Sequence, residues 1–161
     1  DIGRADDYTV LTIMNDKGEQ VAVERWRHEE WSRIIDRVAD SIRKWNALTL
    51  VEVNNQGDVF YEMLQQKCRN LVEPFVTTSA SKPVLIEDLA VSFEQKEIRI
   101  LDHQWLVDEL EAFTYIYNVN TRSVKYSAPD GMHDDGVIST ALAWHCRKHY
   151  SKRGQYKILR A

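Results

Sequence analysis

The chain has 161 residues, 43% apolar and 29% charged, with a formal net charge of −4 at pH 7, which is typical of one soluble globular domain. No apolar run approaches the roughly 20 residues that cross a bilayer, and no stretch resembles a signal peptide, so nothing in the sequence indicates a membrane protein. Cys68 and Cys146 match no disulfide or CxxC pattern, and we expect two reduced thiols in an intracellular protein.

Hydrophobic periodicity defines the expected elements. The clearest helix covers 29–45, where apolar residues from Trp31 to Trp45 recur at helical spacing on one face. The strand over 8–14 is rich in β-branched residues, and Gly18 closes the turn that leads into a return strand. In chain order the sequence predicts strands over 8–14 and 19–27, a helix over 29–45, a strand over 48–53, a helix over 58–69, a strand over 71–76, a helix from 81 to about 95, a brief strand over 97–101, a helix from about 102 to 113, hairpin strands over 114–117 and 123–126, and a helix from 134 to about 149.

This order of elements predicts one domain over 1–161 with a three-layer α/β fold, in which helices flank a central mixed β-sheet. The sequence contains no internal repeat, low-complexity tract or linker that would divide it.

The charge is unevenly distributed along the chain. Residues 146–161 hold six basic and no acidic residues, so the rest of the chain has a net charge of −10. A basic tail on an acidic body is consistent with a phosphate-contacting edge beside a metal site. The alternative is a solubilising helix end.

Acidic residues stand where predicted elements begin or end. Glu52 breaks the apolar strand Leu48–Val53, and a carboxylate in a buried strand is costly unless something pairs with it. Asp1 and Asp7 surround the first turn, and Asp134 and Asp135 open the last helix. Hydrolysis of a phosphodiester by two divalent ions needs carboxylates that converge in this way. We therefore expect a site for two Mg²⁺ or Mn²⁺ ions, since both prefer oxygen ligands.

Each of these acids also has a structural interpretation. Asp134 or Asp135 could cap the last helix, and Asp7 could be a turn residue. His145 and His149 lie one turn apart on a helix and could bind zinc, but no second pair of ligands is evident and a solvated helix end is the simpler interpretation.

Taken together, three motifs match one known family. Asp1-x-Gly3 with Asp7-Tyr8-Thr9, then Val51-Glu52-x-Asn54-x-x-Gly57, then Gly131-Met132-His133-Asp134-Asp135 resemble the nuclease domain of phage and prophage large terminase subunits. The segment 81–113 resembles that family's connecting region, so the resemblance covers essentially the whole chain. It implies an RNase H/RuvC-like fold. It also implies metal-dependent endonuclease activity, by which concatemeric double-stranded DNA is cut during viral genome packaging.

Matched position by position, the family's catalytic and metal-binding carboxylates correspond to Asp1, Glu52 and Asp135. Asp134 is the alternative to Asp135 as the third ligand. Asp7 matches an accessory acidic position near the metals. Asn54, Gly57 and His133 match positions beside the site. The hairpin over 115–126 and the basic tail would face DNA or a partner protein on this interpretation. The candidate DNA-binding residues there are Arg122, Lys125, Arg147, Lys148, Lys152 and Arg153.

The family's other properties are expectations of the same kind. In the family, an ATPase motor precedes the nuclease domain, and here no Gly-rich phosphate loop occurs. The partners implied are double-stranded DNA, that motor domain, the small terminase subunit and the portal, in the cytoplasm of a bacterial host, with the isolated domain a monomer. One departure stands out: apolar strand residues precede the first aspartate in the family, whereas this sequence starts at Asp1.

Two other functions stay open. The chain could be another RNase H-like nuclease, such as a resolvase or transposase core, although the segment 81–113 favours a terminase. It could also be a noncatalytic RNase H-like module that binds DNA or protein.

Overall fold

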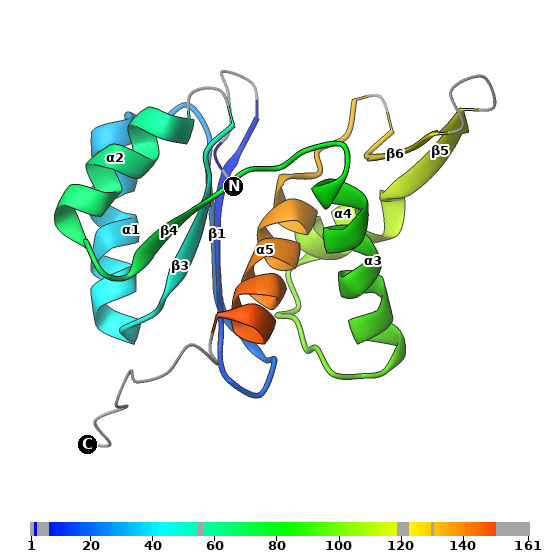
Figure 1. Ribbon diagram of the computed structural model, residues 1–161, viewed down its shortest axis with the longest axis horizontal. Coiled ribbons are helices and arrows are strands. Elements are labelled where there is room, and N and C mark those ends of the chain that lie inside the picture. The colour runs from blue at the N-terminus through cyan, green and yellow to red at the C-terminus, as the bar shows by residue number, and fades with distance from the viewer. Residues whose placement is uncertain (1, 3–6, 55–56, 119–122, 130, 151–161) are drawn as a thin grey trace.

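The computed structural model describes residues 2, 7–54, 57–118, 123–129 and 131–150, with only the backbone described for 115–118 and 123–125. Figure 1 shows how these residues are arranged. The strands are β1 (Thr9–Met14), β2 (Gln20–Trp26), β3 (Thr49–Glu52), β4 (Val72–Phe75), β5 (Thr114–Asn118) and β6 (Ser123–Ser127). The helices are α1 (Trp31–Trp45), α2 (Gly57–Lys67), α3 (Ser81–Glu94), α4 (Gln104–Ala112) and α5 (Asp135–His149).

Helix α1 confirms the prediction made from its apolar face. Ile34, Ile35, Val38, Ala39 and Ile42 are all buried, at the spacing that one face of a helix requires. The helix ends at Trp45, and the next residue, Asn46, has the left-handed conformation common after the last turn of a helix.

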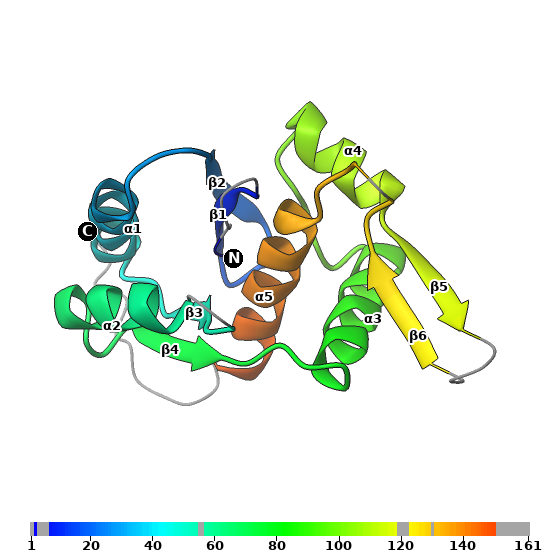
Figure 2. The same ribbon diagram turned by 90° about the horizontal axis from the view of Figure 1, so that it is seen from above.

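The elements form three layers, which Figure 2 shows from above. Helices α1 and α2 lie on one side of strands β1 to β4, and α5 lies on the other side. Beyond α5, away from these strands, lie α3, α4 and the β5–β6 hairpin. One apolar core joins α1 and α2 to the strands, and a second core joins α3 to α5. Helix α5 is therefore the central helix, with partners on both sides.

The middle layer differs from the expected single sheet. β1 pairs with β2 in antiparallel fashion, β3 pairs with β4 in parallel, and β5 pairs with β6 as a separate antiparallel hairpin. Both kinds of pairing that define a mixed sheet are present. However, β1 and β3 form no ladder with each other among the described residues. The strand expected over 97–101 is reduced to one bridge between Glu19 and Arg99.

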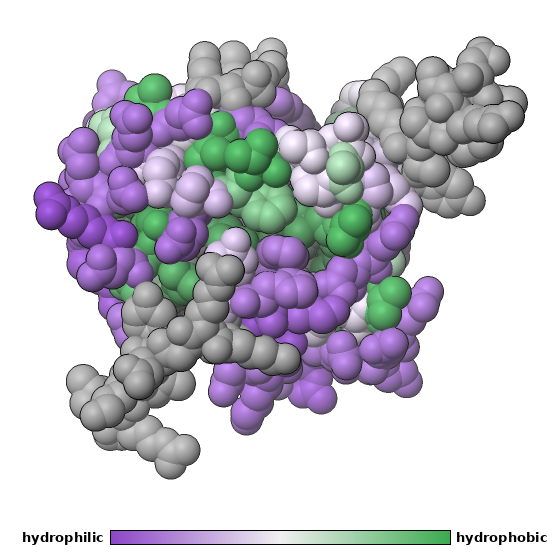
Figure 3. Space-filling model, viewed as in Figure 1, coloured by the Kyte–Doolittle hydropathy of each residue, from purple (hydrophilic) through white to green (hydrophobic). Residues whose placement is uncertain are grey.

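One face of the molecule is apolar in its middle and polar around that middle. Figure 3 shows hydrophobic residues across the middle of one face, with hydrophilic residues around them. Within the part of the chain that the structure describes, no helix is both long enough and apolar enough to cross a bilayer.

Candidate metal site

The start of β1 and the start of α5 lie side by side. β1 packs along α5, and the Ser139 hydroxyl donates a hydrogen bond of 3.1 Å to the Val10 carbonyl. At the end of this contact the Tyr8 backbone N–H donates to Asp135 Oδ2 at 3.0 Å. Residues at the two ends of the sequence are thereby brought to one place.

Three potential metal ligands meet there. One oxygen or nitrogen atom from each of Asp7, His133 and Asp135 lies within 4.8 Å of the others. His133 Nδ1 is 3.7 Å from Asp7 Oδ1 and 3.7 Å from Asp135 Oδ2. Asp7 is exposed whereas Asp135 is buried, so the cluster opens to solvent on the Asp7 side. Two carboxylates and one imidazole fit a divalent cation.

Asp135 is the candidate ligand that the fold constrains most. Its burial raises the pKa of its carboxyl group, and the nearby charges of Asp7 and Asp134 raise it further, while the hydrogen bond from Tyr8 acts in the opposite direction. The carboxylate is thus held in a place where its negative charge is unfavourable. A bound cation would remove that cost because it supplies the missing positive charge.

A second acid, Glu109 on α4, lies behind Asp135. It is 5% exposed, and its Oε2 accepts a hydrogen bond of 2.7 Å from the Gly136 backbone N–H. Its Oε1 is 3.7 Å from the guanidinium of Arg25. Burial raises the pKa of Glu109, and the charge of Asp135 adds to this effect.

Arg25, the basic residue that pairs with Glu109, lies between two aromatic rings. The Arg25 guanidinium lies 4.5 Å from the centre of the Tyr8 ring and 4.3 Å from the Trp105 ring. Tyr8 also makes an edge contact with His133, with ring centres 5.0 Å apart. Contacts therefore run continuously from Asp135 through Tyr8, Arg25 and Glu109 back to the first turn of α5.

Sequence reasoning missed Glu109. The one available signal was its spacing: it stands three residues after the buried Leu106, on the face of α4 that the apolar pattern directs inward. An acid at such a position is expensive unless it has partners.

Asp134 is oriented differently from its neighbour Asp135. Its Oδ2 is 3.2 Å from Lys82 Nζ, and it takes no part in the three-residue cluster. Its side chain also makes no capping hydrogen bond to α5, although Asp134 occupies the N-cap position. The geometry thus favours Asp135 over Asp134 as the metal ligand.

Glu52 and its neighbours form the end of β3. Glu52 Oε1 accepts a hydrogen bond of 3.1 Å from Asn54 Nδ2. The same Asn54 amide group donates to the Thr77 carbonyl at 2.7 Å and accepts from the Thr77 N–H at 3.2 Å. A Cβ on Gly57 would lie 2.2 Å from the Glu52 carbonyl oxygen, so a side chain at this position would clash. Asn54 and Gly57 therefore fix the backbone that carries Glu52. Glu52 lies outside the three-residue cluster, and Asp1 lies outside the described residues.

Two of the six basic residues expected to face DNA have described side chains, and both already have partners. Arg147 donates to the Asp16 carbonyl at 3.0 Å and stacks on Trp144. Lys148 forms a salt bridge with Asp88. Both lie at the far end of α5, about 20 Å along the helix from Asp135. Arg122, Lys152, Arg153 and the side chain of Lys125 lie outside the described residues.

The histidine pair on α5 has no third ligand in the described part of the chain. The His145 and His149 rings are 4.4 Å apart, and His145 packs against Phe75. Burial, together with the nearby His149, lowers the pKa of His145. These contacts support a structural interpretation of the pair.

Large terminase proteins are similar to this chain in sequence and in structure. No family model matches the chain. The chain is 30% identical over 160 residues to the large terminase subunit of Thermus virus P23-45, covering 98% of the chain but only 32% of that relative. The chain thus spans about a third of the length of this curated relative.

Solved structures give the same result for the fold. The large terminase nuclease of the thermophilic phage G20c has been determined with bound magnesium and with bound cobalt. The magnesium form has a TM-score of 0.79 and 26% identity, over 90% of this chain and 77% of the other. The cobalt form has a TM-score of 0.77 and 27% identity, with the same coverage. These likenesses confirm the expected α/β fold class, in which helices flank the strands.

Proposed function

We propose that this chain, which is similar to the large terminase subunit of Thermus virus P23-45 and to the solved large terminase nuclease of phage G20c, is a metal-dependent endonuclease that cuts concatemeric double-stranded DNA during viral genome packaging. The observation that carries the proposal is the meeting of Asp7, His133 and Asp135 at the start of α5. Their chemistry suits a divalent cation, and the buried Asp135 carboxylate needs one to balance its charge.

The proposed reaction is hydrolysis of a phosphodiester by two ions, Mg²⁺ or Mn²⁺, which would activate a water molecule and stabilise the leaving oxygen. Asp135 would hold an ion from the protein side, oriented by the Tyr8 N–H. Asp7 would do so from the exposed side, where the phosphate backbone has access. Asp1 and Glu52 complete the proposed set of catalytic carboxylates, and Asn54 would keep the Glu52 carboxylate at the end of β3.

The presence of His133 bears on the choice of ion. Carboxylates suit Mg²⁺ and Mn²⁺ alike, whereas imidazole nitrogen favours transition metals. If His133 binds the ion directly, Mn²⁺ will be preferred to Mg²⁺. If His133 only orients the carboxylates, Mg²⁺ will serve equally well.

The wider setting is part of the same proposal. The substrate is double-stranded DNA, and the parent protein also carries an N-terminal ATPase motor and works with the small terminase subunit and the portal in the bacterial cytoplasm. We propose that residues 1–161 form one nuclease domain, monomeric when isolated. The basic segment 146–161 and the hairpin are its DNA-facing parts.

Cleavage of supercoiled plasmid tests the proposal. The wild-type chain, Asp135→Asn and Glu52→Gln would be incubated with Mg²⁺ or Mn²⁺, with Asp134→Asn as the matched control next to Asp135. We expect nicking and linearisation by the wild type and by Asp134→Asn, and at least about a hundredfold loss in the other two, because each removes a carboxylate ligand. If Asp135→Asn and Glu52→Gln cut as fast as the wild type, these carboxylates are structural and the nuclease proposal fails.

A further inference from the structure

Arg25 stands where β2, the start of β1 and α4 meet. It is the Cα partner of Val10 on β1, and Tyr8 comes two residues before Val10. Because opposite residues of two paired strands share a face, as do alternate residues of one strand, the side chains of Arg25 and Tyr8 leave the β1–β2 ladder on the same side. Trp105 of α4 meets Arg25 on that side. Arg25 is therefore placed between the start of β1 and α4.

The guanidinium of Arg25 contacts two aromatic rings and one acid. It lies 4.5 Å from the centre of the Tyr8 ring and 4.3 Å from that of the Trp105 ring. One of its nitrogen atoms is 3.7 Å from Glu109 Oε1. A planar guanidinium suits this position because it can stack on aromatic rings while its N–H groups point at a carboxylate. Lysine lacks such a plane, so the position favours arginine over any other cation.

Two chains of contacts lead from Arg25 to Asp135. In the first, Arg25 packs on the Tyr8 ring, and the Tyr8 backbone N–H donates a hydrogen bond of 3.0 Å to Asp135 Oδ2. In the second, Arg25 pairs with Glu109, whose Oε2 accepts a hydrogen bond of 2.7 Å from the backbone N–H of Gly136. Gly136 directly follows Asp135. The metal-ligand candidate is thus held from both sides, and Arg25 belongs to both chains.

Trp105 adds a third support for the same turn of α5. A Cβ placed on Gly136 would be 2.7 Å from Trp105 Cζ3, so the Trp105 ring lies directly against the backbone there. The same ring packs on the Arg25 guanidinium. Without the guanidinium, the Tyr8 and Trp105 rings each lose a contact that fixes their position. We call Tyr8, Arg25, Trp105, Glu109 and Gly136 the Arg25 network.

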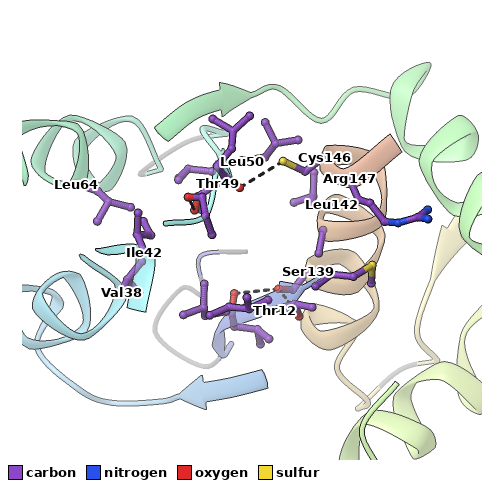
Figure 4. Close-up of a pocket in the computed structure, with 18 of the residues that line it drawn as sticks. Thr12, Val38, Ile42, Thr49, Leu50, Leu64, Ser139, Leu142, Cys146 and Arg147 are labelled. Carbon is purple, nitrogen blue, oxygen red and sulfur yellow. Dashed lines mark hydrogen bonds between the residues drawn. The ribbon is translucent and has the colours of Figure 1, made fainter. Parts of the chain in front are cut away.

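A separate contact further along α5 keeps this helix on β1. The Ser139 hydroxyl donates to the Val10 carbonyl at 3.1 Å and lies 3.0 Å from the Thr12 hydroxyl. Figure 4 shows Ser139 and Thr12 pointing toward each other, with Leu142 following on α5. Ser139 is one turn beyond Asp135. Loss of Arg25 should therefore loosen the first turn of α5 while the rest of the helix stays in place.

We propose that Arg25 is a positioning residue of the metal site, which holds Asp135 in the orientation that binds the cation. The proposal rests on the metal site proposed above. Arg25 does not bind the ion, because its positive charge repels a divalent cation. This repulsion makes the proposal testable by sign. If only the charge of Arg25 matters, its removal strengthens the binding of the cation, whereas loss of positioning weakens it.

Titration of Mn²⁺ at a temperature where all variants are folded tests the proposal. We expect Arg25→Met to bind Mn²⁺ at least about tenfold more weakly than the wild type, as is typical when a metal ligand loses the partners that orient it. Arg25→Lys should be weakened to a similar extent although it keeps the charge. Arg27→Met is the matched control, because Arg27 is exposed, lies 5.3 Å from the Tyr8 ring and is not a member of the network. It should bind Mn²⁺ at least as tightly as the wild type.

Hydrogen exchange of single amides in the metal-free protein provides a second measurement. The Tyr8 and Gly136 amides donate to Asp135 and Glu109. Both amides should exchange at least about tenfold faster in Arg25→Met and Arg25→Lys, because the network no longer holds them. The Val38 amide in the middle of α1 should change much less. This comparison separates local loosening from a general loss of stability.

Wild-type affinity for Mn²⁺ in both Arg25 variants would overturn the proposal and leave the proposed nuclease intact. Tighter binding in Arg25→Met would also overturn it, since the effect of Arg25 would then be electrostatic. So would amides of Tyr8 and Gly136 that accelerate no more than that of Val38. If Arg25→Met does not fold, Arg25→Lys carries the test, because it retains a cation beside Glu109. A wild-type chain that binds no Mn²⁺ would instead overturn the metal site itself, and this role of Arg25 with it.

Discussion

Asp135 combines burial with negative charge, and this combination is unfavourable until a cation binds. Because burial and neighbouring acids raise its pKa, ionisation of this carboxyl group is less favourable in the folded protein than in the unfolded chain. We predict that Asp135→Asn stabilises the metal-free protein at pH 7 by about 1 kcal/mol, as expected when a destabilised functional group is neutralised. The amide oxygen can still accept the hydrogen bond from Tyr8. The same substitution should abolish the rise in melting temperature that Mn²⁺ causes in the wild type.

The control for this prediction is the adjacent residue. Asp134 is paired with Lys82 and takes no part in the cluster, so Asp134→Asn should leave the response to Mn²⁺ intact. Thermal unfolding of the three proteins with and without Mn²⁺ decides between the two aspartates. Loss of the response in Asp134→Asn alone would assign the ligand to Asp134.

The raised pKa values of Asp135 and Glu109 also predict a pH dependence. A carboxyl group with a raised folded-state pKa favours folding while it is protonated. That contribution is lost as pH rises from the ordinary carboxyl pKa, about 4, through the raised value. Metal-free stability should therefore fall over this window, and the stabilisation by Mn²⁺ should grow. Denaturant unfolding between pH 4.5 and 7.5 measures both. A response to Mn²⁺ that stays constant with pH would contradict this account.

At the scale of elements, the first turn of α5 depends on α4. Glu109 binds the Gly136 N–H, and Gly136 has no room for a side chain because its Cβ would lie 2.7 Å from both Glu109 and Trp105. We predict that Glu109→Ala destabilises the protein by about 1–3 kcal/mol, since a buried N–H loses its acceptor. Glu109→Gln should cost less because its amide oxygen still accepts.

Metal binding distinguishes a positioning role of Glu109 from a purely structural one. If α5 presents Asp135 only when Glu109 holds its first turn, the affinity for Mn²⁺ should fall in Glu109→Ala and recover largely in Glu109→Gln. Titration of Mn²⁺ below the melting temperature, where both variants are folded, provides the measurement. Equal affinities in the wild type and in Glu109→Ala would restrict Glu109 to a structural role.

The hydrophobic patterns of individual helices and strands account for what could be predicted from the sequence. Helix α1 and strand β3 were predicted correctly because the pattern of apolar residues within each segment indicates which residues are buried. The resemblance, which depends on motif order, agrees with the similarity to large terminase subunits, and the predicted fold class is confirmed. The cluster itself depends on a contact between residues 127 positions apart, Tyr8 and Asp135, and no local pattern encodes such a contact. The same reason explains why Glu109 was missed.

At the scale of the whole molecule, the distribution of charge sets how DNA can approach. The body of the chain is acidic and the segment 146–161 is basic, while Arg147 and Lys148 are occupied by contacts within the fold. Lys152, Arg153, Lys157 and Arg160 remain as the tail's candidates for contacts with phosphate.

We predict that deletion of residues 151–161 weakens DNA binding while leaving the response to Mn²⁺ unchanged. Each contact between a basic residue and a phosphate contributes about 0.9 to the slope of log K against log salt concentration, so the loss of four should reduce that slope by about 2 to 4. Replacing the four basic residues by glutamine, at constant length, should reproduce the effect if charge is the cause. Binding isotherms on a short duplex at several salt concentrations test both variants. An unchanged slope in both would move the DNA-binding surface away from the tail and toward the β5–β6 hairpin, where Arg122 and Lys125 are the next residues to substitute.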